Sequence, residues 1–450
     1  MALRRLVATE GQRDLVPTVR DDIAMPKKLL ERFLRYVQID TTSDPDSPTY
    51  PSTAKQWDLL RLLADELREL GAHVTLSAHG YVIAEVPATA GCEAVPVVAL
   101  LAHADTAPDY SGTDVKPIVH MNYRGGVLRF PDAADQIIDP ADPRYADLLT
   151  AVGKDVVTAS GKTLLGADDK AGVAILVTLV ACLLAEPVRA HGRIRICITP
   201  DEEVGRGVDH LDLDELGAVV AYTIDGGAVG RISWETFSAD GAVVTIRGVA
   251  THPGEARRYG MVNAVHLAGK LLALLPRETA SPEATDARQG FIHPLRINGN
   301  AAECSVHLIL RDHDNALLAS KGDALRAICG AIEAAHPGAR IECAVSQQYR
   351  NMGYWLRDNM LAVELLRQAC QTAGVVAVDD PVRGGTDGSR LTERGLPTPN
   401  IFTGGHNAHG PLEWVAVQDM QTVVEVLIAL LGNWVERGSE FGGYRSQVSG

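Results

Sequence analysis

Three apolar runs in the first half of the chain each end at a histidine or at acidic residues. Residues 95–103 read VPVVALLAH, residues 193–203 read RIRICITPDEE, and residues 218–227 read AVVAYTIDGG. A near-continuous apolar run of this length is typical of a strand that is buried on both faces of an α/β sheet. Ligands in open α/β folds gather beyond the carboxyl edge of the sheet, so we expect a site where these runs end.

Helical patterns lie between and around these runs. Residues 26–37 begin with a proline suited to a first helical turn, and residues 53–70 carry leucines on one face and stop at Gly71. Residues 170–185 form an apolar helical stretch, and residues 360–370 are amphipathic. Helices that alternate with buried strands predict an α/β domain.

A second pattern occupies the middle of the chain. Its order is strand, helix, two strands, helix, strand, over residues 241–248, 261–276, 291–297, 304–312, 316–336 and 341–347. This β-α-β-β-α-β order is the ferredoxin-like arrangement. We therefore predict an inserted domain over residues 237–348 and a split α/β catalytic domain over residues 26–236 and 349–450. Residues 1–25 read as an extension with little predictable structure.

The composition argues against some classes of partner and favours one cellular location. A net charge of −15 and a pI near 5.4 argue against nucleic acid or an anionic membrane as a partner. The longest apolar runs, of about 15 residues, are too short to span a bilayer. The seven cysteines form no CxxC pair, which favours reduced thiols and a cytoplasmic location.

Polar motifs mark the predicted sheet edge, and each has a structural alternative. His103 and Asp105 share one side of a strand end, where a carboxylate can orient an imidazole. Asp168 and Asp169 begin a helix, which they could simply cap, or one of them could be shared by two cations. Each motif alone is weak evidence for a site.

The remaining acids and imidazoles complete the pattern. Residues 201–203 are three consecutive acids that could be a solvated surface, or could divide metal binding and proton transfer. Asp225 precedes two glycines, and His406 and His409 lie in one loop. Two imidazoles and three carboxylates suffice for two zinc ions that share one carboxylate, and Mn²⁺ or Co²⁺ would suit the same ligands. A further acid could act as general base.

These stretches together resemble a known family. AHADTAPDYSG, KTLLGADDKAG, TPDEEVGRG, YTIDGG, THPGEA and NIFTGGHNAHG are similar to the motifs of the M20 metallopeptidases, and most similar to the tripeptide aminopeptidases of that family. The likeness extends in order from about Pro26 to Trp434. It implies a two-domain zinc-peptidase-like fold in which the inserted domain is a lid.

The resemblance also implies a role for each residue of the centre. One zinc ion would be bound by His103 and Asp225, the other by Glu203 and His409, with Asp168 as the bridge. Glu202 would be the general base and Asp105 would orient His103. The resemblance further implies a cis peptide bond between Asp168 and Asp169.

Substrate contacts are implied outside this cluster. His252 of the inserted domain would stabilise the oxyanion, and Arg311, Arg383 and Asn400 would hold the substrate carboxylate. A homodimer through the inserted domain is the partner that the family suggests, besides a short peptide substrate. His406 would add an imidazole near the metals, where it could alter substrate fit or compete as a ligand.

The sequence thus predicts a dinuclear zinc aminopeptidase that releases the N-terminal residue of tripeptides. Two alternatives stay open. Other members of the family cleave dipeptides or deacylate N-acyl amino acids with the same centre. A non-catalytic metal or peptide binder is the third hypothesis, and an intact Glu202 argues against it because a binder has no need of a base.

Overall fold

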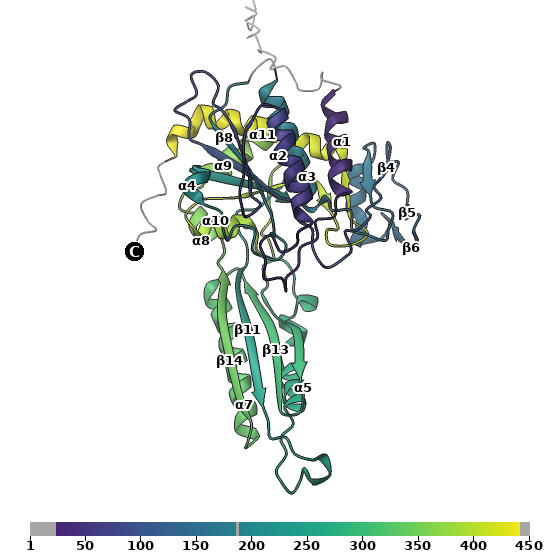
Figure 1. The fold of residues 1–450 in the computed structure, drawn as a ribbon, viewed down its shortest axis with the longest axis vertical. Helices are drawn as coiled ribbons and strands as arrows, with labels where there is room; N and C mark the ends of the chain where they lie inside the picture. Colours follow the sequence, from purple (N-terminus) through teal and green to yellow (C-terminus); the bar gives the residue numbers. More distant parts are fainter. Residues whose placement is uncertain (1–23, 186–188, 442–450) are drawn as a thin grey trace, which may run out of the picture.

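The structure, a computed structural model, describes residues 24–185 and 189–441, and it has two parts (Figure 1). The first part contains a six-stranded sheet in the order β1-β2-β8-β3-β9-β16. Its strands are β1 (His73–Leu76), β2 (Val82–Val86), β8 (Ile194–Thr199), β3 (Val98–His103), β9 (Val220–Gly226) and β16 (Asn400–Phe402). The four strands from β8 to β16 are parallel, and β2 runs antiparallel to both of its neighbours. The three apolar runs of the sequence are therefore adjacent central strands.

Helices cover both faces of this sheet. One face packs on a large core to which α1 (Ala24–Val37), α2 (Gln56–Glu69), α3 (Ala167–Leu184), α9 (Leu361–Thr372) and α11 (Val417–Arg437) contribute. The other face packs on α4 (Leu213–Leu216), α10 (Asp387–Glu393) and the segment between β8 and α4. Burial on both faces explains why β3 is apolar along its whole length. The predicted α/β fold is confirmed.

Residues between β3 and α3, together with residues 405–416, build a small sheet beside the central one. Its order is β17-β18-β7-β4, with a separate hairpin of β5 and β6. The strands are β4 (Ile118–His120), β5 (Leu128–Phe130), β6 (Ala133–Ile138), β7 (Val156–Thr158), β17 (Gly405–His406) and β18 (Trp414–Ala416), and the 3-10 helix η2 (Pro143–Ala151) precedes β7. The predicted long loop thus contains short strands, and the pairing of β7 with β18 joins it to the C-terminal part of the chain.

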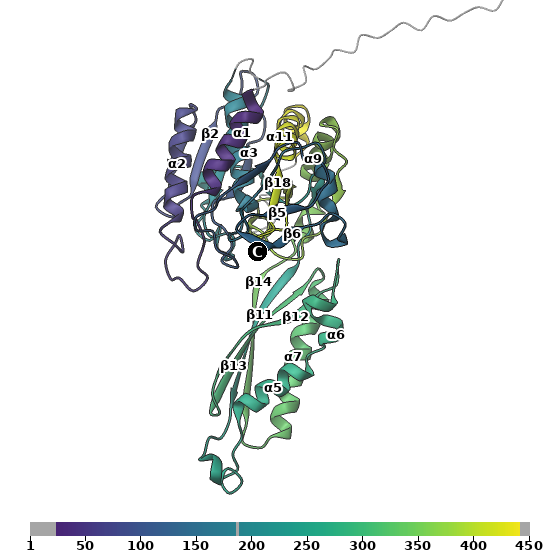
Figure 2. The ribbon, with the colours of Figure 1, turned by 90° about the vertical axis from the view of Figure 1, so that its right-hand side faces the viewer.

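The second part is an antiparallel sheet that extends away from the first (Figures 1 and 2). Its order is β12-β13-β11-β14. The chain passes through β11 (Ser238–Arg247), α5 (Ala264–Leu274), β12 (Phe291–Gly299), β13 (Glu303–Asp312), α7 (Asn315–Ala335) and β14 (Arg340–Tyr349), with the short helix α6 (Arg277–Ala280) before β12. Figure 2 shows α5 and α7 on one face of the sheet, where they bury a core of their own. This is the predicted β-α-β-β-α-β order, whereas the exact domain limits stay a prediction.

The junction with the central sheet is made by short elements. They are β10 (Arg231–Ile232), which pairs in parallel with β15 (Val378–Asp379), and α8 (Gly353–Leu356), which follows β14. The predicted unstructured extension over residues 1–25 lies mostly outside the described residues, but its last two residues already belong to α1. Within the described ranges no helix is long and apolar enough to cross a membrane.

Candidate dinuclear metal centre

Five predicted metal ligands meet at the carboxyl edge of the central sheet. His103 ends β3, Asp225 lies at the end of β9, and Asp168 lies in the first turn of α3. Glu203 follows β8, and His409 lies in the loop between β17 and β18. Parallel strands end at the same edge, so segments that are far apart in the sequence converge here.

His103 is almost completely buried, with 2% of its side chain exposed, and both ring nitrogens face acids. Nε2 lies 3.1 Å from Asp168 Oδ1 and 3.5 Å from Asp225 Oδ1. Nδ1 lies 3.0 Å from the carbonyl oxygen of Asp105 and 3.4 Å from its Oδ1. A ligand imidazole usually has this arrangement, with one nitrogen free for a cation and the other held by an oxygen.

His409 lies on the other side of Asp168. Its Nε2 is 3.0 Å from Glu203 Oε2 and 3.4 Å from Asp168 Oδ2, and its Nδ1 is 3.5 Å from Asp109 Oδ2. Asp168 therefore presents one oxygen to each imidazole, as a bridging carboxylate must. Two sets of donor atoms could each hold a cation, because the atoms of each set lie within 4.8 Å of one another. One set belongs to His103, Asp168 and Glu203, and the other to His103, Glu202 and Asp225.

Without a cation, the acids of this cluster carry strongly shifted pKa values. Burial, with the charge of Asp168 added, raises the pKa of Glu203 to about 7. Burial and the neighbouring Asp225 raise the pKa of Glu202 well above its ordinary value. Hydrogen bonds to Asp168 and Glu203 also raise the pKa of His409, to about 11, which favours the charged form of this imidazole. Crowded acids that resist ionisation are an arrangement that a divalent cation relieves.

The donor set fits two divalent cations. Glu203 Oε1 is buried and has no hydrogen-bond partner among the described residues, so one carboxylate oxygen is left for a ligand. Nitrogen and oxygen donors without thiolate suit Zn²⁺, Mn²⁺ or Co²⁺. The residues that would hold such ions are His103, Asp168, Glu203, Asp225 and His409.

Asp105 connects the two sides of the cluster. It is fully buried, and its Oδ1 and Oδ2 accept hydrogen bonds from the backbone N–H groups of Glu202 (3.0 Å) and Glu203 (3.2 Å). The same residue contacts His103 Nδ1. Asp105 thus holds the backbone of Glu202, the predicted base, as well as the imidazole of His103. The sequence predicted only the second of these contacts.

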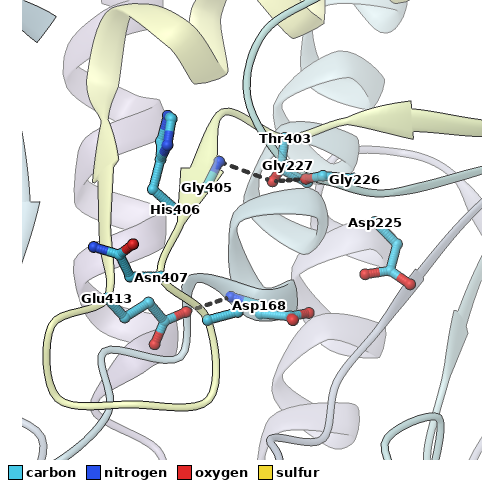
Figure 3. Close-up of a pocket in the computed structure, with 10 residues that line it drawn as sticks. Asp168, Asp225, Gly226, Gly227, Thr403, Gly405, His406, Asn407 and Glu413 are labelled. Carbon is cyan, nitrogen blue, oxygen red and sulfur yellow. Dashed lines mark hydrogen bonds between the residues drawn. The ribbon is translucent and has the colours of Figure 1, made fainter. Parts of the chain in front are cut away.

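Glu413 belongs to the site, although the sequence reasoning missed it. It is 1% exposed, and its carboxylate accepts hydrogen bonds from the backbone N–H groups of Leu165 (2.8 Å), Gly166 (2.7 Å) and Asp168 (2.9 Å). Figure 3 shows this carboxylate beside Asp168. Burial raises the pKa of Glu413 to about 7. The only sequence signal was a lone acid before an apolar strand, four residues after His409.

Two other acids support the loops around the centre. Asp201, the first of the three consecutive acids, accepts hydrogen bonds from the backbone N–H of Ser52 (2.7 Å), Gln56 Nε2 (2.7 Å) and Arg206 Nη2 (3.1 Å). It therefore anchors the turn and does not face the cluster. Asp169 accepts a hydrogen bond from the N–H of His103 at 3.2 Å. The peptide bond between Asp168 and Asp169 is cis, as the family resemblance implied.

His252 is not brought to the metal cluster. It is exposed and belongs to the loop between β11 and α5. Figure 1 shows this loop at the end of the second sheet that is farthest from the central sheet. The 10 residues of β11 separate this loop from the junction, which at about 3.3 Å per residue is roughly 30 Å. Within one copy of the chain, His252 therefore makes no contact with the centre in this conformation.

The predicted carboxylate-binding residues lie at the junction of the two parts. Arg311 Nη1 donates to the carbonyl oxygens of Leu310 (3.0 Å) and Asp240 (3.3 Å), and its guanidinium lies over the ring of Tyr349 at 5.5 Å. Burial raises the pKa of Tyr349, and the charge of Glu202 adds to this shift. Arg311 thus contacts Tyr349, the last residue of β14.

Arg383 and Asn400 already have partners within the chain. Arg383 Nη1 donates to the carbonyl oxygens of Ala287 and Gln289, both at 2.9 Å, so it holds the loop before β12. Asn400 is 2% exposed, and its Oδ1 accepts a hydrogen bond from Thr223 Oγ1 at 2.6 Å. In this conformation both residues act as structural contacts, and their substrate contacts stay a prediction.

His406 does not join the metal ligands. Its ring stacks on Trp414 with centroids 3.9 Å apart, and burial lowers its pKa to about 4. A stacked, neutral imidazole outside both donor groups does not compete as a ligand here. Instead it lines a cavity of about 220 Å³ next to the centre (Figure 3).

Comparison with known proteins agrees with this geometry. The model of Peptidase family M20/M25/M40 matches residues 164–433. Peptidase T of Geobacillus thermodenitrificans is 40% identical over 408 residues, which cover 90% of this chain and 98% of that protein. Peptidase T of Exiguobacterium is 41% identical over 92% of this chain and 99% of its own length. The chain belongs to the M20 peptidase family.

Solved structures of M20 peptidases share the fold. The aminopeptidase PepT from Bacillus cereus superposes with a TM-score of 0.69 at 21% identity, over 91% of this chain and 99% of that one. A tripeptidase from Staphylococcus aureus gives a TM-score of 0.71 at the same identity and coverage. This M20 peptidase is therefore a hydrolase of the peptidase T group, with a central mixed sheet and a separate antiparallel sheet.

Proposed function

We propose that this hydrolase is a dinuclear zinc aminopeptidase that releases the N-terminal residue of tripeptides. The observation that supports this most is the position of Asp168 between the two imidazoles, with one oxygen toward His103 and the other toward His409. One cation would be held by His103 and Asp225, the other by Glu203 and His409. When bound, such a pair polarises a carbonyl group and lowers the pKa of water.

Glu202 would act as the general base and then as the general acid. Its backbone N–H is held by Asp105, and its side chain offers an oxygen in the donor group with His103 and Asp225. A carboxylate in this place can take the proton of the attacking water and give it to the leaving amine. Burial and the charge of Asp225 raise the pKa of Glu202 and favour its protonated form, while nearby cations would favour the ionised form that begins the cycle.

The substrate class follows from the relatives. Proteins about 40% identical over nine tenths of this chain carry the name peptidase T, and one solved neighbour is described as a tripeptidase. These names support tripeptides as substrates. A cytoplasmic location stays a prediction.

His252 would serve the centre of a second copy. It is exposed at the far end of the second sheet, where it cannot reach its own centre in this conformation. A homodimer that pairs through the inserted domains would place the imidazole of one copy over the centre of the other, where it could stabilise the oxyanion.

Complementation between two inactive variants tests this arrangement. A mixture of His252→Ala and Glu202→Gln chains, unfolded and refolded together, would contain heterodimers with one intact centre. Recovery of up to about a quarter of the wild-type activity is expected, since half of the dimers are mixed and each has one working centre of two. No recovery from a mixture shown to form heterodimers would contradict a role in trans.

Product identification tests the proposed reaction itself. Matched di-, tri- and tetrapeptides and an N-acetylated tripeptide would be incubated with the enzyme, with and without chelator, and the products weighed by mass spectrometry. Chelator-sensitive release of only the first residue, fastest from the free tripeptide, is expected. Cleavage of the acetylated peptide, or of dipeptides alone, would move the enzyme to another branch of the family.

A further inference from the structure

A cavity adjoins the metal centre on the side of β16 and β17. Asp168 and Asp225 form one wall, and Figure 3 shows Glu413 and His406 on the opposite side. The remaining lining residues are small or polar: Gly226, Gly227, Thr403, Gly405, Asn407 and Ala408. Its volume of about 220 Å³ leaves room for a ligand group next to the bridging carboxylate.

The chemistry of the lining favours a small or neutral polar group. Of its three carboxylates, Asp168 and Asp225 are proposed metal ligands and Glu413 accepts hydrogen bonds from three backbone N–H groups. No lysine or arginine of the described chain borders the cavity. His406 is stacked on Trp414 and is held neutral by burial. No leucine, isoleucine, valine or phenylalanine lines the cavity in the part of the chain that the structure describes. A large apolar side chain would find few contacts here.

The position of Glu202 sets the direction of the peptide. If Glu202 gives the proton to the leaving amine, the leaving part of the substrate lies on its side of the centre. The cavity borders Asp168 and Asp225 but not Glu202, so it is available to the part of the peptide before the scissile bond.

We propose that this cavity binds the first residue of the peptide. The side chain of that residue would lie against Gly227, His406 and Ala408. The composition of the walls then makes small or polar first residues better substrates than large apolar ones. This inference rests on the proposed aminopeptidase function and adds the residues that select the substrate.

Gly227 and Ala408 allow the cavity to be narrowed with little disturbance. A Cβ at Gly227 would meet only the carbonyl oxygen of Gly405, at an ordinary 3.8 Å, whereas a Cβ at Gly226 would lie 2.8 Å from the carbonyl oxygen of Ile401. Ala408 is exposed, so a longer side chain there needs no repacking of a core. Gly227→Ala and Ala408→Leu are therefore suitable variants. Gly269→Ala is a matched control, because a Cβ there, on α5, meets nothing within 4 Å.

The test compares the three variants on two peptide series. In X-Gly-Gly the first residue is Gly, Ala, Ser, Leu or Phe, and in Gly-X-Gly the second residue varies. We expect each cavity variant to lower the ratio of kcat/KM for Leu-first over Gly-first peptides by roughly tenfold, while the Gly-X-Gly ratios and the control stay within about twofold.

Other outcomes would overturn the subsite. Equal losses across the X-Gly-Gly series, a change confined to the Gly-X-Gly series, or a wild-type preference for Phe-first peptides would each exclude the cavity as the site of the first residue. Failure of the wild-type enzyme to cleave any member of either series would instead overturn the proposed function, so the two failures are distinguishable.

Discussion

The carboxyl edge of the central sheet and the far loop of the second sheet contribute to one proposed reaction in different ways. At the sheet edge, side chains from five segments already lie close to one another, and the buried residues Asp105 and Glu413 hold the backbone beside them through hydrogen bonds. In the far loop, His252 is exposed, and its Nδ1 accepts a local hydrogen bond from the N–H of Gly254 at 3.2 Å. We therefore propose that one chain supplies all the metal ligands, whereas oxyanion stabilisation by His252 requires a second copy.

The largest effect on activity is expected at the sheet edge, from a variant that removes the proposed base and leaves the residues around it unchanged. Glu202→Gln should keep the metal-binding set and lower kcat by a factor of about 10³, the middle of the usual range for a general base. Metal content by mass spectrometry and steady-state kinetics would check both parts. Turnover at the wild-type rate would show that another group takes the proton, and Glu69→Gln, at an exposed helix end, is the control.

Loss of the distal imidazole should have the next largest effect on activity. His252→Ala should lower kcat by about 10²-fold, as for other oxyanion donors, with little change in metal content or thermal stability, because the residue is exposed and its side chain accepts a local hydrogen bond from the N–H of Gly254. Kinetics and calorimetry would be compared with His266→Ala, another exposed inserted-domain histidine. Equal kinetics for the two variants would remove His252 from the mechanism.

Glu413 tests whether the cluster depends on the residues behind it. Glu413→Ala leaves the N–H groups of Leu165, Gly166 and Asp168 without their acceptor, so we expect the free energy of unfolding to fall by about 2 kcal/mol or more. Urea denaturation of the metal-free protein would measure this. Unchanged stability would mean that water or a neighbouring group replaces the carboxylate.

The raised pKa of Glu413 also predicts a pH dependence. Its pKa is about 7 in the folded chain against about 4.3 when unfolded, so between these values the folded chain binds more protons and stability falls as the pH rises. The metal-free protein should therefore lose stability from pH 5 to pH 7.5. Glu413→Gln should lose less over the same interval, and an equal loss in both proteins would contradict this source of the dependence.

Arg383 should give the smallest effect on the reaction. Its donors hold the carbonyl oxygens of Ala287 and Gln289, so Arg383→Lys should weaken the junction and raise KM about threefold with little change in kcat. If the residue binds the substrate carboxylate instead, the rise in KM should disappear with C-terminally amidated tripeptides. Comparing KM for free and amidated peptides separates the two roles.

Much of the metal centre could be predicted because the residues at the ends of the apolar strands indicate where the polar edge of the sheet lies. Apolar runs that end in His103, Glu202 with Glu203, and Asp225 fix which edge of the sheet holds polar groups, whatever the rest of the chain does. The central sheet and the β-α-β-β-α-β order of the second sheet followed from the same reading of periodicity. The family resemblance added the remaining ligand assignments.

The features that the sequence did not predict depend on contacts between segments that are distant in the chain. Glu413 reaches the start of α3 only because β18 pairs with β7, and nothing local in the sequence reports that pairing. Asp201 is chemically equal to its two neighbours, yet it turns away toward Ser52 and Gln56. The place of His252 follows from the direction and length of β11, so a resemblance in sequence did not reveal its distance from the centre.

Anomalous X-ray diffraction from crystals grown with zinc would test the central claim most directly. The account predicts two peaks at the carboxyl edge of the central sheet, one beside His103 and Asp225 and the other beside Glu203 and His409, with Asp168 between them. A single peak, or peaks that Asp168 does not separate, would contradict the bridging carboxylate on which the proposed function rests.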